Sequence, residues 1–409
     1  MVPNGWTSTN LGKIMEFKNG LNFKKSDSGE LIKIVGVGDF KDFSELNEMG
    51  HLQTVNVSNI IKNDELLKDG DLLFVRSNGN KDLIGRCLFF PQVNERLSFS
   101  GFTIRGRVNI KKALPDYIAS LARSSFMKQQ ISKSGGGTNI SNLSQQILND
   151  IVLLLPALPE QKKIIQILST WDKAISNTEK LLANSELQKK ALMQQLLTGK
   201  KRFYGFNADW DEYSLQKLGT TYNGLSGKSK NDFKRGKSYI PYVNIFNNSK
   251  IKVTKLELVN VESGERQNQV KYGDIFFTTS SETPHEVGMS SVLLDTLNET
   301  YLNSFCFGFR LYDFKRLLPS FAQFFLRSAK IRKEISALAQ GATRYNLSPT
   351  RLMKIKFKLP SVKEQQKIAL VLSGSDKEIE ILQQKLDCLK QEKKALMQQL
   401  LTGKLRVKP

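Results

Sequence analysis

One stretch of twelve residues occurs twice in the chain. Residues 189–200 read KKALMQQLLTGK, and residues 393–404 repeat the same letters 204 positions further on. The similarity continues upstream without a gap, because residues 155–164 (LPALPEQKKI) align with residues 359–368 (LPSVKEQQKI) at the same offset. This offset is half of the 409-residue chain. An internal repeat of that length predicts two copies of one large structural unit, not a solenoid of short repeats.

The repeated stretch closes a long segment with a heptad pattern. Apolar residues recur at alternating steps of four and three in each copy, which predicts a coiled-coil helix. Gly199 and Gly403 stand where a helix C-cap glycine belongs. The predicted helix-pairing residues are Ile164, Leu168, Trp171, Ile175, Leu182, Leu192 and Leu196 in the first copy, and Ile368, Leu372, Ile379, Leu382, Leu386, Leu389, Leu396 and Leu400 in the second.

We expect each helix to pair with the other copy. Thr178 and Ser185 of the first helix align with leucines of the second, and Trp171 aligns with Ser375, so the two helices are not interchangeable. This asymmetry favours pairing of the two copies over pairing of like with like. The alternative is that each helix packs only on its own domain.

The chain is strongly basic, with 61 Lys and Arg against 39 Asp and Glu and a formal net charge of +22. The excess is spread over both halves and is not confined to a tail. Such a surplus favours a polyanionic partner, and nucleic acid is the usual one. A generally basic, solvated surface is the alternative.

The cysteines and the hydropathy pattern exclude other classes of protein. Cys87, Cys306 and Cys388 lie far apart, without a metal-binding spacing, and their odd number argues against a disulfide framework. The chain has no run of 18 apolar residues. We therefore expect a cytoplasmic protein that does not contact a membrane.

The domain boundaries follow from the repeat. We predict a first globular domain over residues 1–154, a helix over 155–202, a second globular domain over 203–358 and a second helix over 359–409. In the first domain the predicted elements are strands Leu31–Phe40, Asp71–Arg76, Cys87–Pro91, Phe99–Ile104 and Ile151–Leu155, and a helix over Pro115–Ile131.

The second domain keeps the landmarks of the first and changes the sequence between them. The matching landmarks are Trp6 with Trp210, Leu11 with Leu215, Gly70-Asp71 with Gly273-Asp274, and Asn142-Leu143-Ser144 with Asn346-Leu347-Ser348. By contrast, Ser77–Phe90 shares almost nothing with Ser280–Leu294. Two copies of one structure therefore carry two different sets of surface residues, as a device with two binding surfaces would.

This pattern resembles the specificity subunit of a type I restriction-modification system. The resemblance rests on the doubled proline–EQ–helix–LLTGK block, the Trp openings, the Gly-Asp landmarks and the Asn-Leu-Ser segments, and it covers nearly the whole chain. It implies an α+β fold: two similar globular target-recognition domains, joined and spaced by two long helices packed as an antiparallel coiled coil.

The resemblance also implies a function. Each recognition domain would read one half of a bipartite, asymmetric sequence in double-stranded DNA. The subunit would dock two modification subunits, which methylate adenine with S-adenosylmethionine, and restriction subunits that use ATP and Mg. The chain itself would bind no cofactor and catalyse nothing.

The residues agree that chemistry is absent. None of the 11 prolines is adjacent to another, so the chain lacks the [DN]-P-P-[FY] loop of an adenine methyltransferase. Gly227-Lys228-Ser229 lacks the earlier glycine of a phosphate-binding loop, and His51 and His285 have no companion residues for a metal or nucleophile site. Two alternatives remain: an orphan or silent DNA-binding specificity protein, and a single-chain nuclease–methyltransferase.

DNA readout requires polar side chains on loops or helix ends. For each of the residues chosen on this ground, a solvated surface role remains the alternative. The DNA-contact candidates are Lys24, Lys25, Arg76, Ser77, Asn78, Asn80, Lys81, Thr138 and Asn139 in the first domain, and Lys228, Lys230, Lys234, Arg235, Lys237, Ser280, Glu282, Thr283, His285, Thr343, Arg344 and Tyr345 in the second.

Overall fold

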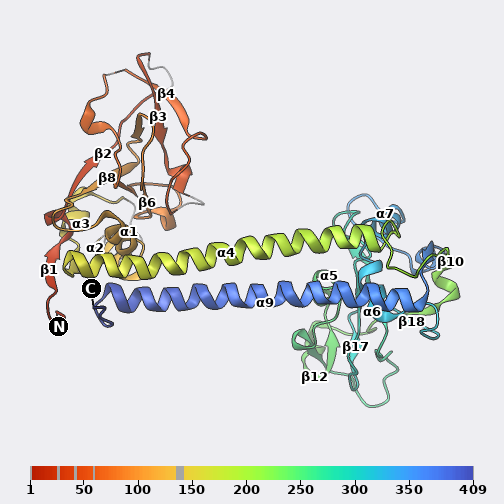
Figure 1. The fold of residues 1–409 in the computed structure, drawn as a ribbon. Helices are drawn as coiled ribbons and strands as arrows, with labels where there is room; N and C mark the ends of the chain where they lie inside the picture. The colour runs from red at the N-terminus through yellow and green to blue at the C-terminus, as the bar shows by residue number, and fades with distance from the viewer. Residues whose placement is uncertain (1, 25–27, 41–43, 59, 135–141, 409) are drawn as a thin grey trace. The chain divides into compact units, whose positions relative to one another are not determined.

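The computed structural model describes residues 2–24, 28–40, 44–58, 60–134 and 142–408 of the protein. The chain divides into two compact units: unit 1 comprises Met1–Glu179 and Lys385–Pro409, and unit 2 comprises Lys180–Gln384. Each unit holds one globular domain, domain 1 or domain 2, and one segment of each long helix, α4 (Leu158–Leu196) and α9 (Val362–Leu401) (Figure 1). No helix in the described part of the chain is long and apolar enough to cross a membrane.

Domain 1 combines small sheets with short helices. A four-stranded antiparallel sheet has the order β2-β8-β5-β6, a three-stranded sheet has the order β4-β3-β7, and β1 pairs with β9. The strands are β1 (Thr7–Asn10), β2 (Met15–Asn19), β3 (Glu30–Val35), β4 (Gln53–Val57), β5 (Leu72–Val75), β6 (Cys87–Phe89), β7 (Leu97–Phe99), β8 (Thr103–Val108) and β9 (Val152–Leu155). The helices are α1 (Pro115–Ala122), α2 (Ser125–Ser134) and α3 (Gln145–Asp150), with 3-10 turns at Leu11–Lys13, Val37–Phe40, Asn63–Glu65 and Lys81–Leu83.

Domain 2 repeats this topology. Its four-stranded sheet has the order β11-β18-β14-β16, its three-stranded sheet the order β13-β12-β17, and β10 pairs with β20. The strands are β10 (Asp211–Ser214), β11 (Gly219–Asn223), β12 (Phe233–Ile240), β13 (Glu257–Val259), β14 (Ile275–Thr278), β15 (Ser280–Ser281), β16 (Ser290–Val292), β17 (Tyr301–Leu302), β18 (Cys306–Leu311), β19 (Tyr345–Asn346) and β20 (Lys356–Leu359). The helices are α5 (Tyr242–Asn247), α6 (Pro319–Phe325), α7 (Ala329–Ala337) and α8 (Pro349–Leu352), with 3-10 turns at Leu215–Lys217, Lys230–Asp232 and Val253–Lys255. The prediction that one plan is used twice is thereby confirmed.

A central strand in each domain lies between two hydrophobic cores. In β5 all four side chains are buried: Leu72 and Phe74 pack in one core, whereas Leu73 and Val75 pack in another. Successive side chains of a strand point to opposite faces, so a strand covered on both faces must be apolar throughout. In β14, Ile275 and Phe277 pack in one core and Phe276 packs in another. The buried Thr278 is polar, and its hydroxyl accepts the Met289 N–H at 2.9 Å.

Three predicted elements of domain 1 are wrong in their bounds. The predicted helix Pro115–Ile131 is two helices, because the Ser124 hydroxyl accepts the Met127 N–H at 3.3 Å and starts α2 after α1 has ended. The predicted strand Leu31–Phe40 ends at Val35, and a 3-10 turn follows in which the Asp39 carboxylate accepts the Gly36 N–H.

The third error concerns the predicted strand Phe99–Ile104. Its two ends belong to β7 and β8, and Ser100–Phe102 between them form a tight turn in which the Thr103 N–H and hydroxyl both donate to the Ser100 carbonyl. The predicted strands Asp71–Arg76, Cys87–Pro91 and Ile151–Leu155 are confirmed as β5, β6 and β9, each shorter by one or two residues.

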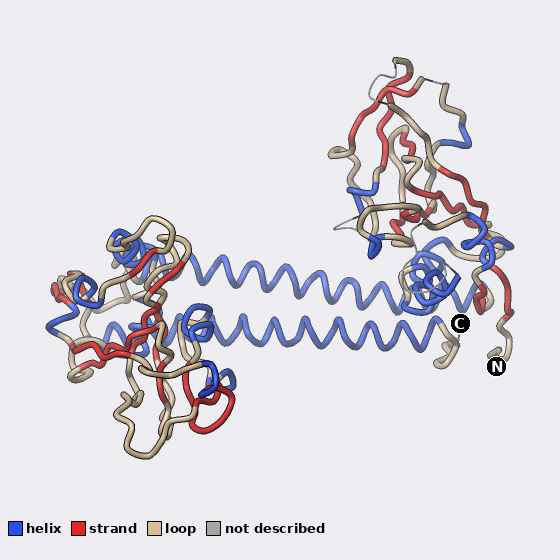
Figure 2. Tube along the Cα trace, turned by 180° about the vertical axis from the view of Figure 1, so that it is seen from behind, coloured by secondary structure: helices blue, strands red, loops and turns tan. Residues whose placement is uncertain are grey.

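The two long helices are continuous (Figure 2) and pair with each other in both units. Lys393 of α9 pairs with Asp172 of α4 in unit 1, and Lys189 of α4 pairs with Asp376 of α9 in unit 2. These contacts, with Arg406–Glu160 and Arg202–Glu364, run in opposite chain directions, so the pairing is antiparallel. Every predicted helix-pairing residue is buried or half-buried. Ile164, Leu168 and Leu400 belong to the core of domain 1, and Leu196, Ile368 and Leu372 belong to the core of domain 2.

The end of each long helix belongs to the core of a domain from the other repeat. Leu400 and Leu401 of α9 are buried in the core of domain 1, and Leu196 and Leu197 close the core of domain 2. Gly403 and Gly199 end the two helices at φ +70° and +72°, as predicted for C-cap glycines. The KKALMQQLLTGK stretch therefore has the same packing role in both copies. The copy in α4 packs on domain 2, and the copy in α9 packs on domain 1.

The EQ pair at the start of each long helix joins that helix to its surroundings. Gln161 accepts the Leu114 N–H at 2.8 Å and donates to the Pro156 carbonyl, and Gln365 makes the equivalent bonds to Leu318 and Pro360. These two glutamines are fully buried. Their bonds fix the start of each long helix against its domain.

The glutamates of the EQ pairs bind arginines that follow the end of the other helix. Glu160 accepts two bonds from Arg406, at 2.8 and 2.9 Å, and a third from the Trp6 indole at 3.1 Å. The Arg406 guanidinium holds the pKa of Glu160 below its ordinary value. In unit 2, Glu364 accepts two bonds from Arg202, at 2.9 and 2.7 Å. A buried carboxylate needs such a partner, so these residues lock each helix end in place.

The Gly-Asp landmarks hold the central strands. Asp71 and Asp274 are buried, and each forms a two-pronged ion pair with an arginine of the neighbouring strand, Arg107 in β8 and Arg310 in β18. Asp274 also accepts the Tyr222 hydroxyl at 2.6 Å. Strands β5 and β14, which follow these aspartates, lead directly into loops that were predicted from the sequence to contact DNA.

Truncating Leu400 tests whether the end of α9 is part of the core of domain 1. Because Leu400 is fully buried, Leu400→Ala should lower the free energy of unfolding of unit 1 by about 2–5 kcal/mol. The matched control Leu187→Ala removes the same atoms from an exposed position of α4 and should change stability by no more than about 0.5 kcal/mol. Hydrogen exchange measured peptide by peptide separates the two units. Unchanged protection of β2 and β8 in the Leu400 variant would contradict the packing.

A second substitution tests the Asp–Arg pairs. Arg310→Ala leaves the Asp274 carboxylate buried without its counter-charge, so domain 2 should lose about 3 kcal/mol of stability. Lys356→Ala, which breaks an exposed pair with Glu212 in the same domain, should leave stability almost unchanged. Denaturant unfolding followed by exchange of β14 peptides compares the two, and equal effects would argue against a structural role for the buried pair.

Candidate nucleic-acid interface

Three segments of domain 1 meet at one end of its four-stranded sheet. Strand β8 lies between β2 and β5 and is antiparallel to both, so the segments that follow β2 and β5 lie beside the turn that precedes β8. Gly101 donates its N–H to the Leu21 carbonyl at 2.7 Å, and Arg76 donates its N–H to the Phe102 carbonyl at 2.8 Å. Sheet topology thus gathers these segments from distant parts of the sequence.

A cavity of about 720 Å³ lies at this end of domain 1. Ser77, Asn78 and Gly79 line it from the loop after β5, and Phe102 lines it from the turn before β8. The other lining residues are Phe23, Ile34, Gly36, Val37, Gly38, Asp39, His51, Gln53 and Ser100. The surface therefore combines hydrogen-bonding groups with aromatic rings.

The predicted contact residues of domain 1 differ in where they lie. Ser77 and Asn78 line the cavity, and Arg76 lies at its edge with its guanidinium 3.4 Å from the Gly101 carbonyl. Asn80 accepts the Asp82 N–H and so starts a 3-10 turn, beside an exposed Lys81. Lys24 is also exposed. Lys25, Thr138 and Asn139 lie outside the described residues.

In domain 2 the structure joins two of the predicted loops. Strand β15 pairs with β19, with Ser280 opposite Asn346 and Ser281 opposite Tyr345. The segments Thr278–His285 and Ala342–Tyr345 are therefore neighbours, although about 60 residues of sequence separate them. This surface lies at the same sheet end as in domain 1, because Thr279 donates its N–H to the Phe305 carbonyl at 2.9 Å.

Several side chains in this region hold the loop itself. Arg332 of α7 donates to the carbonyls of His285, Val287 and Gly288, and burial lowers the pKa of this guanidinium to about 10, so it stays charged at neutral pH. The Thr283 hydroxyl donates to Glu286 at 2.8 Å. Glu282, His285, Thr343 and Arg344 are exposed, while Ser280 and Tyr345 are half-buried.

The predicted lysine-rich segment of domain 2 is partly engaged in ion pairs. The Lys228 side chain is almost fully buried, and its Nζ lies 2.6 Å from the Glu265 Oε1. Lys237 forms an ion pair with Glu299. Because the Glu265 carboxylate neutralises the Lys228 ammonium, this residue is a poor candidate for a phosphate contact. Lys230, Lys234 and Arg235 of the same segment are exposed.

Sequence reasoning missed the aromatic residues of this surface. Phe102 was assigned to a strand, although it lies in the turn between β7 and β8 and its side chain is exposed. Ser-Gly at positions 100–101 was the available signal, because small polar residues and glycine favour a turn. Phe23, His51 and Gln53 reach the cavity only through tertiary packing, which no local pattern reveals.

The described residues contain no group of three or more His, Cys, Asp or Glu side chains that could hold a metal ion. Burial raises the pKa of the Cys87 thiol to about 12, and it also raises that of Cys306. Such thiols stay protonated at neutral pH, which makes them poor nucleophiles.

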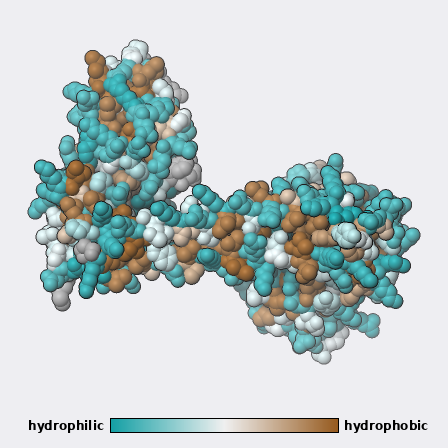
Figure 3. Space-filling view, viewed as in Figure 1, coloured by the Kyte–Doolittle hydropathy of each residue, from teal (hydrophilic) through white to brown (hydrophobic). Residues whose placement is uncertain are grey.

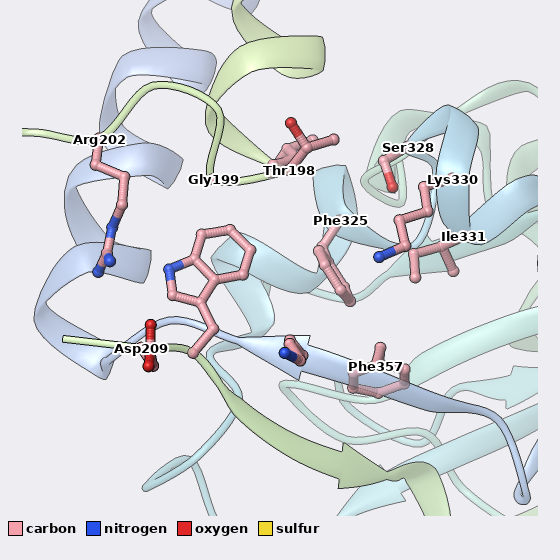
Figure 4. Close-up of a pocket in the computed structure, with 12 residues that line it drawn as sticks. Thr198, Gly199, Arg202, Asp209, Phe325, Ser328, Lys330, Ile331 and Phe357 are labelled. Carbon is pink, nitrogen blue, oxygen red and sulfur yellow. The ribbon is translucent and has the colours of Figure 1, made fainter. Parts of the chain in front are cut away.

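A separate pocket of about 240 Å³ lies where the end of α4 packs on domain 2 (Figure 4). Thr198, Gly199 and Arg202 approach it from the helix end, and Phe325, Ser328 and Phe357 from the domain. None of the predicted DNA-contact residues lines it. This pocket is therefore part of the joint between helix and domain, not of the loop surface.

The molecular surface is mainly hydrophilic on the face shown in Figure 3, with hydrophobic patches among the hydrophilic ones on both domains and on the helices. Leu181, Leu187, Leu370 and Ile381 are exposed apolar residues on the unit 2 segments of α4 and α9. Exposed leucine and isoleucine on a paired helix are unnecessary for the pairing itself.

Comparisons with known proteins agree with this architecture. A family model for the type I restriction modification DNA specificity domain matches residues 3–186 and again residues 207–391. The chain is 26% identical over 430 aligned positions to a putative type I restriction enzyme specificity subunit, MjaX, of Methanocaldococcus jannaschii, and the alignment covers 100% of this chain and 95% of that protein.

Solved structures share the fold. A chain from a structure concerning complex assembly and conformational transition of the type I R-M system superposes with a TM-score of 0.63 at 16% identity, covering 99% of this chain and 100% of that one. The HsdS subunit of Thermoanaerobacter tengcongensis gives a TM-score of 0.56 at 16% identity, covering 99% and 98%. The resemblance inferred from the sequence is confirmed. The chain belongs to the family of type I restriction-modification specificity subunits and carries two copies of that family's DNA specificity domain.

Proposed function

We propose that the chain reads a split, asymmetric target in double-stranded DNA, with one recognition domain for each half-site. The observation that carries this proposal is the pairing of an identical fold with different loops: domain 1 and domain 2 have equivalent sheets, yet the loops at the equivalent sheet end share almost no sequence. Two equal surfaces would read a repeated half-site. Two different surfaces suit two different half-sites.

Each loop surface has the chemistry for groove readout. In domain 1, Ser77 and Asn78 carry side-chain donors and acceptors for base edges, with Arg76, Lys24 and Lys81 nearby for bases or phosphates. In domain 2, the equivalent donors and acceptors are carried by Ser280, Glu282, Thr343 and Arg344. The net charge of +22 supplies the salt-dependent attraction to the phosphates.

The chain contributes recognition, and partner subunits contribute chemistry. We infer that two modification subunits dock on it and methylate adenine with S-adenosylmethionine, and that restriction subunits using ATP and Mg join them for cleavage. The sequence lacks a methyltransferase loop, so the flipping and methylation of the base fall to a partner. Leu187, Leu370 and Ile381 on the paired helices are exposed apolar side chains that such docking would cover.

Substitutions in one domain should affect one half of the target. Ser77→Ala/Asn78→Ala should weaken binding to the first half-site, and Thr343→Ala/Arg344→Ala should weaken binding to the second, each by about 5- to 100-fold, because each removes hydrogen bonds to bases. Competition binding with duplexes that carry one scrambled half measures the effect. Lys111→Ala, at the opposite end of β8, is the control and should leave the preference unchanged. An equal loss for both halves would contradict independent reading.

The decisive test of the proposed function is a map of methylated sites. The chain is expressed with its proposed modification subunit in a host that lacks DNA methylation, and N6-methyladenine is located by long-read sequencing. We expect one two-part motif with a fixed spacer and one methylated adenine on each strand. A continuous motif would contradict two-domain reading. DNA binding without any methylation would instead favour an orphan specificity protein.

A further inference from the structure

Domain 1 and domain 2 expose a phenylalanine at the same point of the fold. Phe102 is 64% exposed and Phe305 is 60% exposed. Phe102 immediately precedes β8, and Phe305 immediately precedes the equivalent strand β18. Both residues therefore lie in the turn that enters the central part of the four-stranded sheet.

The two turns are built by the same hydrogen bonds from different residues. The Phe102 carbonyl accepts the N–H of Arg76, and the Phe305 carbonyl accepts the N–H of Thr279. The Phe102 N–H donates to the Ser100 hydroxyl at 3.2 Å, and the Phe305 N–H donates to the Asn303 side chain at 2.8 Å. Hydrogen bonds thus hold the backbone of the turn in both domains, although different residues make these bonds.

The same bonds place each ring beside a loop assigned to DNA. The Arg76 carbonyl accepts the Leu143 N–H, and the Thr279 carbonyl accepts the Leu347 N–H, so each loop is held between the phenylalanine turn and the Asn-Leu-Ser segment. Phe102 lines the same cavity as Ser77 and Asn78. The Phe305 carbonyl accepts the N–H of Thr279, the residue that precedes β15.

Packing within the chain does not explain these rings. A single exposed apolar side chain is ordinary on a protein surface. Here, however, the loops on either side have diverged almost completely between residues 77–90 and 280–294, while an exposed phenylalanine occupies the turn in both domains. An exposed ring beside a loop with hydrogen-bonding groups, present in both domains, suits a partner that offers flat apolar faces and polar edges together.

We propose that Phe102 and Phe305 each contact a base within one half-site of the DNA target. This inference rests on the proposed function and assigns to each domain a direct aromatic contact. The ring would pack on a thymine methyl group or against the face of a base, while the adjacent loop residues bond the base edges. Duplex DNA fits the surface because the chain carries a net charge of +22 and the rings adjoin the loops with exposed Lys81 and Arg344.

The test compares matched alanine substitutions at the two ends of each strand. Phe102→Ala and Phe305→Ala remove the proposed contacts. Ile110→Ala and Tyr312→Ala remove equally exposed apolar residues, at 70% and 68%, that follow β8 and β18 at their other ends. Each variant is assembled with the modification subunits, and its affinity is measured for the split duplex found from the methylation map and for duplexes with one scrambled half.

We expect Phe102→Ala to weaken binding about 10-fold or more and to reduce the preference for an intact first half-site only. Phe305→Ala should do the same for the second half-site, and both controls should stay within about twofold of the original chain. Because both rings are exposed, hydrogen exchange of β5, β8, β14 and β18 should be unchanged, which separates lost contact from lost fold. Phe102→Leu, which keeps an apolar side chain without the flat ring, should lose part of the affinity.

Two results would overturn the proposal in distinguishable ways. If the original chain binds its split duplex and the phenylalanine variants behave like the controls, the aromatic contacts do not exist and the proposed function stands. If the original chain with its modification subunits selects no split target, the proposed function fails and this inference fails with it.

Discussion

The architecture depends on two ion pairs, each between a buried glutamate at the start of one long helix and an arginine that follows the end of the other. Glu160 lies at the start of α4 and binds Arg406, which follows the end of α9; Glu364 lies at the start of α9 and binds Arg202, which follows the end of α4. A buried carboxylate that lacks a counter-charge strongly destabilises the fold. Each domain core therefore contains leucines from the helix of the other repeat. The identical KKALMQQLLTGK stretches follow from this exchange, because each must present the same leucines to an equivalent core.

This constraint leaves the loops free to differ. The residues that hold the domains together lie in the sheets and at the helix ends: the Asp–Arg pairs below β5 and β14, the EQ pairs, and the closing leucines. The loops after β5 and β14 are held largely through their own backbone groups, which bond other backbone groups and, in domain 2, the side chains of Arg332 and Ser336 of α7. Other loop sequences carry the same backbone groups. A change of loop side chains can therefore alter what a domain binds without disturbing how it folds. A protein whose specificity must vary while its partners stay the same would benefit from that separation.

The elements that were predictable from sequence are those with a long-range periodic or repeated signal. The heptad pattern identified helix-pairing residues that are all buried or half-buried, and the glycines after both helices lie in the left-handed region. Short elements were less predictable. The helix over Pro115–Ile131 is broken by the Ser124 cap, and the turn at Ser100–Phe102 was taken for a strand. Among the candidate DNA contacts, the pairing of β15 with β19 and the burial of Lys228 against Glu265 depend on residues far away in sequence. Nothing local distinguishes a paired lysine from a free one.

The measurement that tests the account most directly is a change of helix length. Four residues, one helical turn, are inserted between Glu179 and Lys180 of α4 and between Gln384 and Lys385 of α9, where the two units divide. The methylated motif is then mapped again. If the paired helices set the separation of two independent reading domains, the two half-sites should keep their sequences, and the added length of about 6 Å should lengthen the spacer by roughly one to two base pairs. An unchanged spacer, or a change in the half-sites themselves, would contradict the account.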